Sequence, residues 1–367
     1  MGLHVVAYGG LRLAMTLHAI ELGASAATIG LLAAIFGVGP VLTSIVLGRW
    51  VDRVGARVPM IIASAGVVVS VAIGWLWRDL PGLFVAAAII GVSWNFYYIA
   101  QQPVLGRFGA ADIVANFSLA GLAVAFGSFI GPALTGIALD VFGYGRTLLL
   151  LVLFPIVPLA ILLGNRLRLP ETPAARPPGK SGGALALLVE PRLRTIYAFA
   201  VTAGSAWQML LFLLPLFGVS LRLSSTLIGF AVGALPLASA ASRVVAPAAV
   251  RRFKVWPVVA ASLACAAAGL ALLPFAGSFA TLMLCSLWLG FALGIGNPLG
   301  QALLYEAAPK DRIGEALGLW AMMASTAQTV APLVSGVIAA SVGMAPVFWL
   351  LAVGLAACSY AGRRRGK

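Results

Sequence analysis

Charged and metal-binding side chains are scarce in this chain. Of its 367 residues, only 9% are charged and 62% are hydrophobic, whereas a soluble globular protein carries about 25% charged residues. The two His and three Cys residues are too few for a metal cluster or a disulfide framework. The composition therefore excludes a soluble globular fold and indicates an integral membrane protein.

Catalytic and nucleotide-binding motifs are also missing. The sequence has no HExxH motif, no cluster of His and Asp, and no glycine-rich nucleotide loop. We therefore expect neither an enzyme nor a bound cofactor or metal. A membrane-embedded enzyme or a transport-dead sensor is the alternative from a different functional class.

What the chain has instead is a series of long apolar runs. A helix needs about 20 apolar residues to cross the hydrocarbon core of a bilayer. We predict twelve spans, at residues 3–22, 26–48, 59–77, 82–104, 113–138, 146–164, 195–218, 226–248, 256–275, 279–303, 316–340 and 344–361. The first run begins almost at Met1 without a preceding basic segment, which favours a membrane span over a cleavable signal peptide. The expected fold class is all-α and integral to the membrane.

The basic residues predict the orientation of these spans. The net charge is +14, and 20 of the 24 Lys and Arg residues, Arg243 among them, are assigned to the loops after even-numbered spans or to the tail 362–367. Basic loops stay on the cytosolic side of a membrane. We therefore expect a multi-pass plasma (inner) membrane protein with both termini in the cytosol. The same distribution explains the charge without any binding to nucleic acid.

The chain divides into two similar halves around a polar segment. Residues 165–194, rich in Pro and basic side chains, are expected to form a cytosolic linker between the halves 1–164 and 195–361. Sequence patterns return at an offset of 199 or 200; the run 127–136, for example, corresponds to 327–336. Parallel repeats of six helices are typical of secondary transporters.

A charged motif follows the second span. It reads Gly48-Arg-Trp-Val-Asp52-Arg53-Val-Gly55-Ala-Arg57 and resembles the G-x-x-x-D-R-x-G-x-R signature of the major facilitator superfamily (MFS). The resemblance covers the whole chain and implies the twelve-helix MFS fold, secondary transport and a monomer. In physical terms, the glycines permit a tight turn, Asp52 favours the positive end of a helix in a gate, and the arginines pair with carboxylates or phosphates. A plain positively charged loop is the alternative.

A run of small residues in the fifth span resembles a second signature of the family. Gly127, Gly131, Pro132 and Gly136 match part of the G-x-x-x-G-P-x-x-G-G pattern of antiporter branches, with Thr135 in place of one glycine. This resemblance implies an exporter of the efflux type. Ordinary close packing of helices is the alternative, because small residues let helix backbones approach each other.

Proton coupling is left open by the sequence. The fourth span lacks the Arg that drug–proton antiporters of this family often carry, and no acidic residue lies deep within a span. The candidate proton carriers are His18 and Glu21, near the outer end of the first span. A pair that caps this end of the helix is the alternative.

Polar side chains repeat along the fourth and tenth spans. With glycines at positions 91, 290 and 294 they form two equivalent helical faces at an offset of 199. Because polar groups in hydrocarbon are costly, these faces are expected to line a shared central cavity, and interhelical hydrogen bonding is the alternative. The candidate residues are Asn95, Tyr98, Gln102, Asn297 and Gln301, with Gln208 of the seventh span as a weaker one.

Arg12 is the most unusual residue within a predicted span. It is aligned with Tyr8 and Thr16 on one face of the first span, and a charge at this depth costs about 3 kcal/mol on insertion scales. It either contacts an anionic or carboxylate-bearing substrate or has a structural partner. The tryptophans expected to stack on a flat organic substrate are Trp94, Trp207 and Trp288.

These patterns predict a secondary transporter that moves small organic or amphipathic solutes by alternating access. Export is the preferred direction, and uptake of an organic anion is the alternative. The expected partners are a small-molecule substrate, the lipid bilayer and, for antiport, protons.

Overall fold

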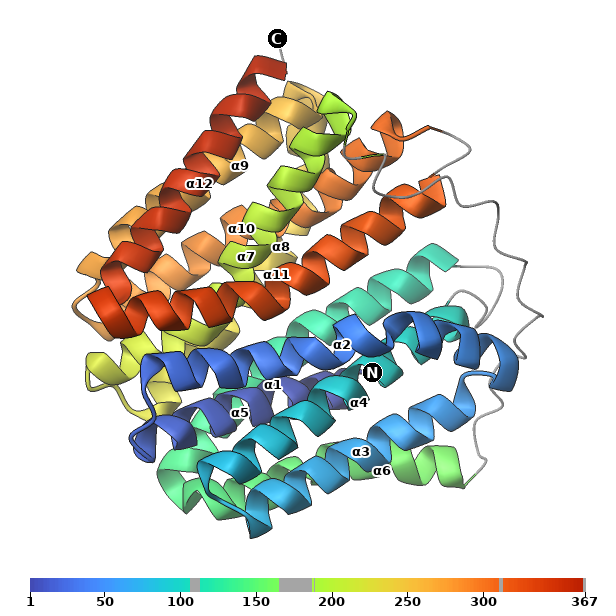
Figure 1. Ribbon diagram of the computed structural model, residues 1–367, viewed down its shortest axis with the longest axis vertical. Helices are drawn as coiled ribbons and strands as arrows, with labels where there is room; N and C mark the ends of the chain where they lie inside the picture. The colour runs from blue at the N-terminus through green and yellow to red at the C-terminus, as the bar shows by residue number, and fades with distance from the viewer. Residues whose placement is uncertain (106–112, 165–186, 188, 310–312, 366–367) are drawn as a thin grey trace. The chain divides into compact units, whose positions relative to one another are not determined.

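The computed structural model describes residues 1–105, 113–164, 187, 189–309 and 313–365, and all regular secondary structure in these residues is helical (Figure 1). In order, the elements are α1 (Gly2–Glu21), α2 (Ala26–Val54), α3 (Arg57–Leu76), α4 (Leu80–Leu105), α5 (Ile113–Leu151), α6 (Leu153–Leu163), α7 (Pro191–Ser220), α8 (Ser225–Phe253), α9 (Val255–Leu272), the short 3-10 turn η2 (Leu273–Phe275), α10 (Phe279–Ala307), α11 (Ile313–Val342) and α12 (Met344–Arg365). The predicted all-α membrane fold with twelve helices is confirmed.

The fifth and sixth predicted spans form one long apolar segment. Of the eleven described segments that are long and apolar enough to cross a membrane, the segment Leu119–Leu163 has 45 residues, more than twice the length that one crossing needs. Gly143 breaks it with φ 71, a left-handed conformation that favours glycine. The segment therefore accounts for two crossings. The predicted start of the sixth span at residue 146 is too late, because the helix resumes directly after Gly143.

Helix α2 runs further than its apolar residues predict. Ser25 starts it by accepting a hydrogen bond from the Thr28 N–H at 3.1 Å, and Gly55 ends it with φ 81. The motif that was expected in a loop therefore lies largely in the last turns of α2. Ser224, 199 residues after Ser25, accepts an N–H at 3.4 Å at the start of α8.

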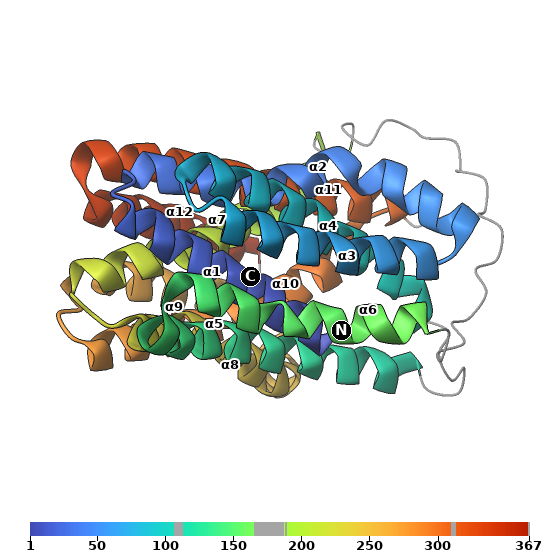
Figure 2. The same ribbon diagram turned by 90° about the horizontal axis from the view of Figure 1, so that it is seen from below.

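The described helices form two compact units. Unit 1 comprises residues 1–177 and 223–233, and unit 2 comprises residues 178–222 and 234–367. In unit 1, α1 packs against α5, and α3 packs against α4 and α6; in unit 2, α7 packs against α11, and α9 packs against α10 and α12 (Figures 1 and 2). The order of packing is thus the same in both units. The boundaries of the linker 165–194 stay a prediction, since residues 165–186 and 188 lie outside the described part.

Equivalent helices also touch at equivalent residues. A Cβ added to Gly91 on α4 would lie 2.6 Å from the carbonyl oxygen of Phe36 on α2, and one added to Gly290 on α10 would overlap the carbonyl oxygen of Leu235 on α8. Both pairs of positions differ by 199 in sequence number. Glycine is required here because the backbones approach too closely for any side chain.

A buried apolar cluster holds the charged end of α2 in place within unit 1. Leu47 and Val51 of α2 pack there with Met60 of α3, Tyr97 of α4 and Leu162 of α6. The end of α2 that carries the motif residues is therefore packed into the core of unit 1.

Candidate functional site

Aromatic side chains from three helices surround Arg12 in unit 1. The ring of Tyr8 stacks on Trp94 with centroids 4.7 Å apart and meets Phe36 edge-on at 6.2 Å. The guanidinium carbon of Arg12 lies 5.8 Å from the Phe36 ring centre, within the range of a cation–π contact. Tyr98, 6.2 Å from Trp94, is 47% exposed and makes the cluster accessible from outside.

Arg12 itself is buried, with 8% of its surface exposed. The predicted neighbour Tyr8 lies against the same Phe36 ring as Arg12. The Tyr8 hydroxyl is buried without a hydrogen-bond partner among the described residues. The predicted neighbour Thr16 donates its hydroxyl to the Arg12 carbonyl oxygen at 2.8 Å. The Tyr8 hydroxyl is therefore enclosed without a partner among the described residues, whereas the Thr16 hydroxyl donates within its own helix.

Asn95 points toward α2. Its side-chain amide nitrogen lies 3.1 Å from the hydroxyls of both Thr43 and Ser44, and the residue is only 6% exposed. These contacts favour interhelical hydrogen bonding for Asn95, the alternative to a cavity role. Its predicted companion Gln102 is half-buried.

A polar hollow of about 270 Å³ lies among α7, α8, α10 and α11 in unit 2. Its lining includes the predicted candidates Gln208 and Trp207. It also includes Trp320 and Arg243, which the sequence did not place there. The hollow thus combines aromatic faces, an amide and a guanidinium group, which suit a flat solute with an anionic group.

The assignment of Arg243 to a cytosolic loop is wrong, and it also conflicts with the predicted eighth span, 226–248, which contains this residue. The residue lies within α8, ten residues before the helix ends at Phe253, or about 15 Å along the helix axis. No ion pair between described residues involves it. Arg243 is therefore an exposed residue that lines the hollow, and no carboxylate from the described part of the chain neutralises its charge.

The internal repeat explains why there is room for Arg243. The positions equivalent to Arg243 and Gly294 in unit 1 are Ser44 and Asn95, which hydrogen-bond to each other. In unit 2, Gly294 stands in place of Asn95, and the long cationic side chain of Arg243 stands in place of Ser44. Both Arg243 and Gly294 line the hollow.

The charged motif is described in part. Arg57 donates a hydrogen bond to the Leu162 carbonyl oxygen and so ties the start of α3 to the end of α6. Arg53 is exposed, and a Cβ at Gly48 would meet open space. The side chains of Asp52 and of the cavity candidate Asn297 lie outside the described part, and Gln301 is exposed on α10.

The small-residue run of α5 packs closely against its neighbours. A Cβ at Gly127 would lie 2.8 Å from the Gly2 carbonyl oxygen, and one at Gly131 would lie 2.6 Å from the Val6 carbonyl oxygen. A Cβ at Gly136 would overlap a backbone oxygen at the start of α8. Pro132 lies inside the same helix. Close packing is thus sufficient to explain these glycines.

His18 and Glu21 form a pair at the end of α1. The His18 Nδ1 lies 3.0 Å from a Glu21 carboxylate oxygen, and its Nε2 lies 3.2 Å from the Arg78 carbonyl oxygen. The ring also stacks on Tyr144 with centroids 3.8 Å apart. These contacts favour the interpretation that His18 and Glu21 cap the end of α1, which was the alternative to a role as proton carriers.

A family model and one curated relative match the sequence. The family model described as "Major Facilitator Superfamily" matches residues 1–280 and 202–364. A "Tetracycline resistance protein, class D" from Salmonella ordonez is 29% identical over 112 residues, which cover 30% of this chain and only 28% of that protein.

Solved structures match over nearly the whole chain. The nucleoside transporter NupG has a TM-score of 0.77 at 15% identity, with 99% of this chain and 98% of that chain covered. A POT family transporter in complex with 5-aminolevulinic acid has a TM-score of 0.78 at 16% identity, with 98% and 93% covered. At these identities the likeness shows the fold alone.

Proposed function

The chain belongs to the major facilitator superfamily of membrane transporters, and we propose that it exports a small organic solute with an anionic group by alternating access. The observation that carries this proposal is the position of Arg243 within α8, where it lines a hollow together with Trp207, Gln208 and Trp320. Arg243 is exposed and is not neutralised by a carboxylate of the described residues, so an anionic group of a solute is a suitable partner for it.

The chemistry of Arg12 and Arg243 supports an anionic, flat substrate. A guanidinium group binds a carboxylate or phosphate through two parallel hydrogen bonds, and aromatic rings next to it offer a stacking surface. Arg12 lies against Phe36, and Arg243 lines the same hollow as two tryptophans. Each unit, taken by itself, therefore contains an arginine near aromatic rings.

Export is the direction favoured by the similarity to a tetracycline resistance protein, because expulsion of a compound is how a transporter confers resistance to it. The second candidate is uptake of an organic anion. It is favoured by α4, which contains no Arg, unlike the fourth span of many drug–proton antiporters of the family.

The remaining features of the proposal follow from the sequence. The halves 1–164 and 195–361, joined by the linker 165–194, would alternate between two states, with Asp52 acting in the gate. The transporter would be a monomer in the plasma (inner) membrane with both termini in the cytosol, and protons would be the coupling ion for export.

The test measures the transport of a panel of aromatic carboxylates and their uncharged amides in inside-out and right-side-out vesicles, with and without a pH gradient. A hydrogen bond to a charged group contributes about 1.5–3 kcal/mol. We therefore expect Arg243→Gln to lower carboxylate transport about tenfold or more, Arg243→Lys to retain part of it, and the amides to be transported equally by all variants.

Arg363→Gln, at an exposed position on α12, is the matched control and should transport like the unmodified protein. Unchanged carboxylate transport by Arg243→Gln would contradict the proposed role of this residue. Carboxylate accumulation in right-side-out vesicles alone would replace export with uptake.

A further inference from the structure

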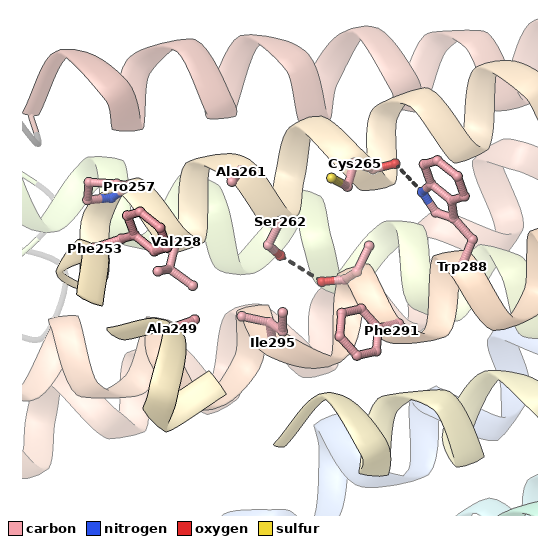
Figure 3. A pocket seen from close by; sticks show the side chains of 11 residues that line it. Ala249, Phe253, Pro257, Val258, Ala261, Ser262, Cys265, Trp288, Phe291 and Ile295 are labelled. Carbon is pink, nitrogen blue, oxygen red and sulfur yellow. Dashed lines mark hydrogen bonds between the residues drawn. The ribbon is translucent and has the colours of Figure 1, made fainter. Parts of the chain in front are cut away.

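Unit 2 has a second hollow, an apolar groove lined by residues of three helices. It has a volume of about 640 Å³ and lies among the end of α8, α9 and α10 (Figure 3). Phe253 and Pro257 line one end, and Cys265 and Trp288 line the other. Trp288, predicted to stack on substrate, therefore faces this groove and does not line the hollow that contains Arg243.

The polar atoms along the groove are already engaged within the protein. The Ser262 hydroxyl donates to the Ala292 carbonyl oxygen at 2.6 Å, and the Trp288 indole N–H donates to the Cys265 carbonyl oxygen at 2.8 Å (Figure 3). The remaining surface consists of apolar side chains. An occupant that fits this surface is hydrocarbon, because a polar molecule would lose hydrogen bonds to water without regaining them.

One end of the groove is strongly basic. Arg251, Arg252 and Lys254 flank Phe253 at the end of α8, and all four residues are exposed. The guanidinium carbon of Arg252 lies 5.3 Å from the Phe253 ring centre, so the charge adjoins a residue that lines the groove.

Nothing nearby in the sequence neutralises these charges. The chain contains no Asp or Glu between Pro191 and Tyr305, and no ion pair between described residues involves the three basic side chains. Helix α9 begins directly after Lys254, whose side chain does not cap it. The N–H groups of Val255 and Trp256 in its first turn add positive potential at the same end of the groove, whereas Pro257 has no N–H.

We propose that this groove binds one acyl chain of an anionic phospholipid, whose phosphate lies against Arg251, Arg252 and the start of α9. A charged head next to a hydrocarbon tail is the combination that the basic end and the apolar groove together fit. Basic clusters where a helix leaves the membrane are suited to anionic lipid headgroups. This lipid is distinct from the transported solute, because the groove and the hollow around Arg243 are lined by different residues.

Cys265 provides a direct measure of occupancy, since it is exposed and lines the groove. In purified full-length protein with Cys285→Ala and Cys358→Ala, we would follow the reaction of Cys265 with N-ethylmaleimide in detergent. We expect added phosphatidylglycerol to slow this reaction several-fold and phosphatidylcholine to have little effect. The double variant Arg251→Gln/Arg252→Gln should remove the difference between the two lipids, whereas the matched control Arg363→Gln/Arg364→Gln should keep it.

A second measurement tests the groove itself. Ala261→Phe fills it, whereas Ala357→Phe adds the same ring at an exposed position on α12 that does not line it. Native mass spectrometry should show fewer bound phosphatidylglycerol molecules for the first variant only. Equal protection of Cys265 by both lipids, or selectivity that survives loss of the two arginines, would overturn the proposal. Protection that rises with protein concentration without added lipid would also overturn it and assign the groove to a second copy of the chain.

Discussion

At the scale of single residues, Arg12 and Arg243, which both lie within predicted spans, have different surroundings. Arg12 is buried against Phe36 and Tyr8, so its charge contributes to the packing of unit 1 as well as to any ligand contact. Arg243 lines an open hollow with no ion pair from the described residues. We therefore expect Arg243 to act mainly in binding and Arg12 to act in both binding and packing.

Substitutions of Arg12 separate these two roles. We expect Arg12→Lys to keep part of the transport activity, because lysine retains the charge but loses the planar guanidinium group. Arg12→Ala should lower substrate binding about tenfold or more at near-normal membrane abundance. The measurements are equilibrium binding of a carboxylate probe and quantification of the protein in membranes.

Thr16→Val is the control for Arg12, since the Thr16 hydroxyl only donates to a carbonyl oxygen of its own helix. It should bind the probe normally. If Arg12→Ala binds the probe like the unmodified protein and only its abundance falls, the role of Arg12 is structural and the substrate need not be an anion.

The sequence located some of these residues and missed others for physical reasons. Arg12 stands out because a charge inside the first apolar run has few explanations. Arg243 was missed because the rule that basic residues stay outside the membrane assigned it to the cytosol. Asn95 was placed with Tyr98 because i, i+4 and i+7 positions lie on one face of a helix, and only the structure shows that Asn95 bonds to α2.

At the scale of helices, glycine sets how closely neighbours approach. Gly10 and Gly131 bring α1 and α5 together, and a Cβ at Gly131 would lie 3.2 Å from the Gly10 nitrogen. Backbone atoms cannot move aside as the end of a flexible side chain can. These contacts therefore fix the distance between the two helices.

Gly131→Ala should destabilise the protein, although alanine is the better helix former by about 1 kcal/mol. The added methyl group would collide with the Val6 carbonyl oxygen. We expect the thermal midpoint of the purified protein to fall by several degrees in a fluorescence-based unfolding assay.

Gly48→Ala is the matched substitution, since a Cβ there meets nothing within 4 Å and its backbone is not left-handed. Its thermal midpoint should stay the same or rise slightly. Equal midpoints for Gly131→Ala and the unmodified protein would show that α1 and α5 can separate without cost.

The sequence predicted the existence of the helices better than their ends. Apolar runs of sufficient length identified all twelve, because hydrocarbon requires a helix of about 20 residues. The ends depend on local backbone conformation. Helix α2 continues to Val54 and stops where Gly55 adopts φ 81, a feature that hydrophobicity does not report.

At the scale of the whole molecule, the repeat governs the architecture. The pairs α1–α5 and α7–α11 pack in the same order, as do α3–α6 and α9–α12. The offset of 199 residues, visible in the sequence, also relates the close contacts of Gly91 and Gly290. The repeat in the sequence was enough to predict that the two units pack their helices in the same order. It did not predict which contacts the differing side chains make at equivalent positions.

The orientation in the membrane can be tested on the whole chain. Reporter enzymes fused after Lys367 and inserted within residues 170–183 should both be active on the cytosolic side, because most Lys and Arg residues are assigned to that side. A reporter inserted after Leu22, between α1 and α2, should give the opposite signal. A periplasmic signal from either of the first two fusions would contradict the predicted topology.

The two halves of the chain are copies of one six-helix pattern, and their side chains differ at some equivalent positions. At the positions where Ser44 and Asn95 bond in one copy, the other has Arg243 and Gly294 beside an open space. Unit 1 thus has a hydrogen bond between α2 and α4 at these positions, whereas unit 2 has a cationic side chain that lines a hollow. If Arg243 binds the solute as proposed, substitutions at residues 243 and 294 should change which solutes are transported while the hydrogen bond between Ser44 and Asn95 stays intact.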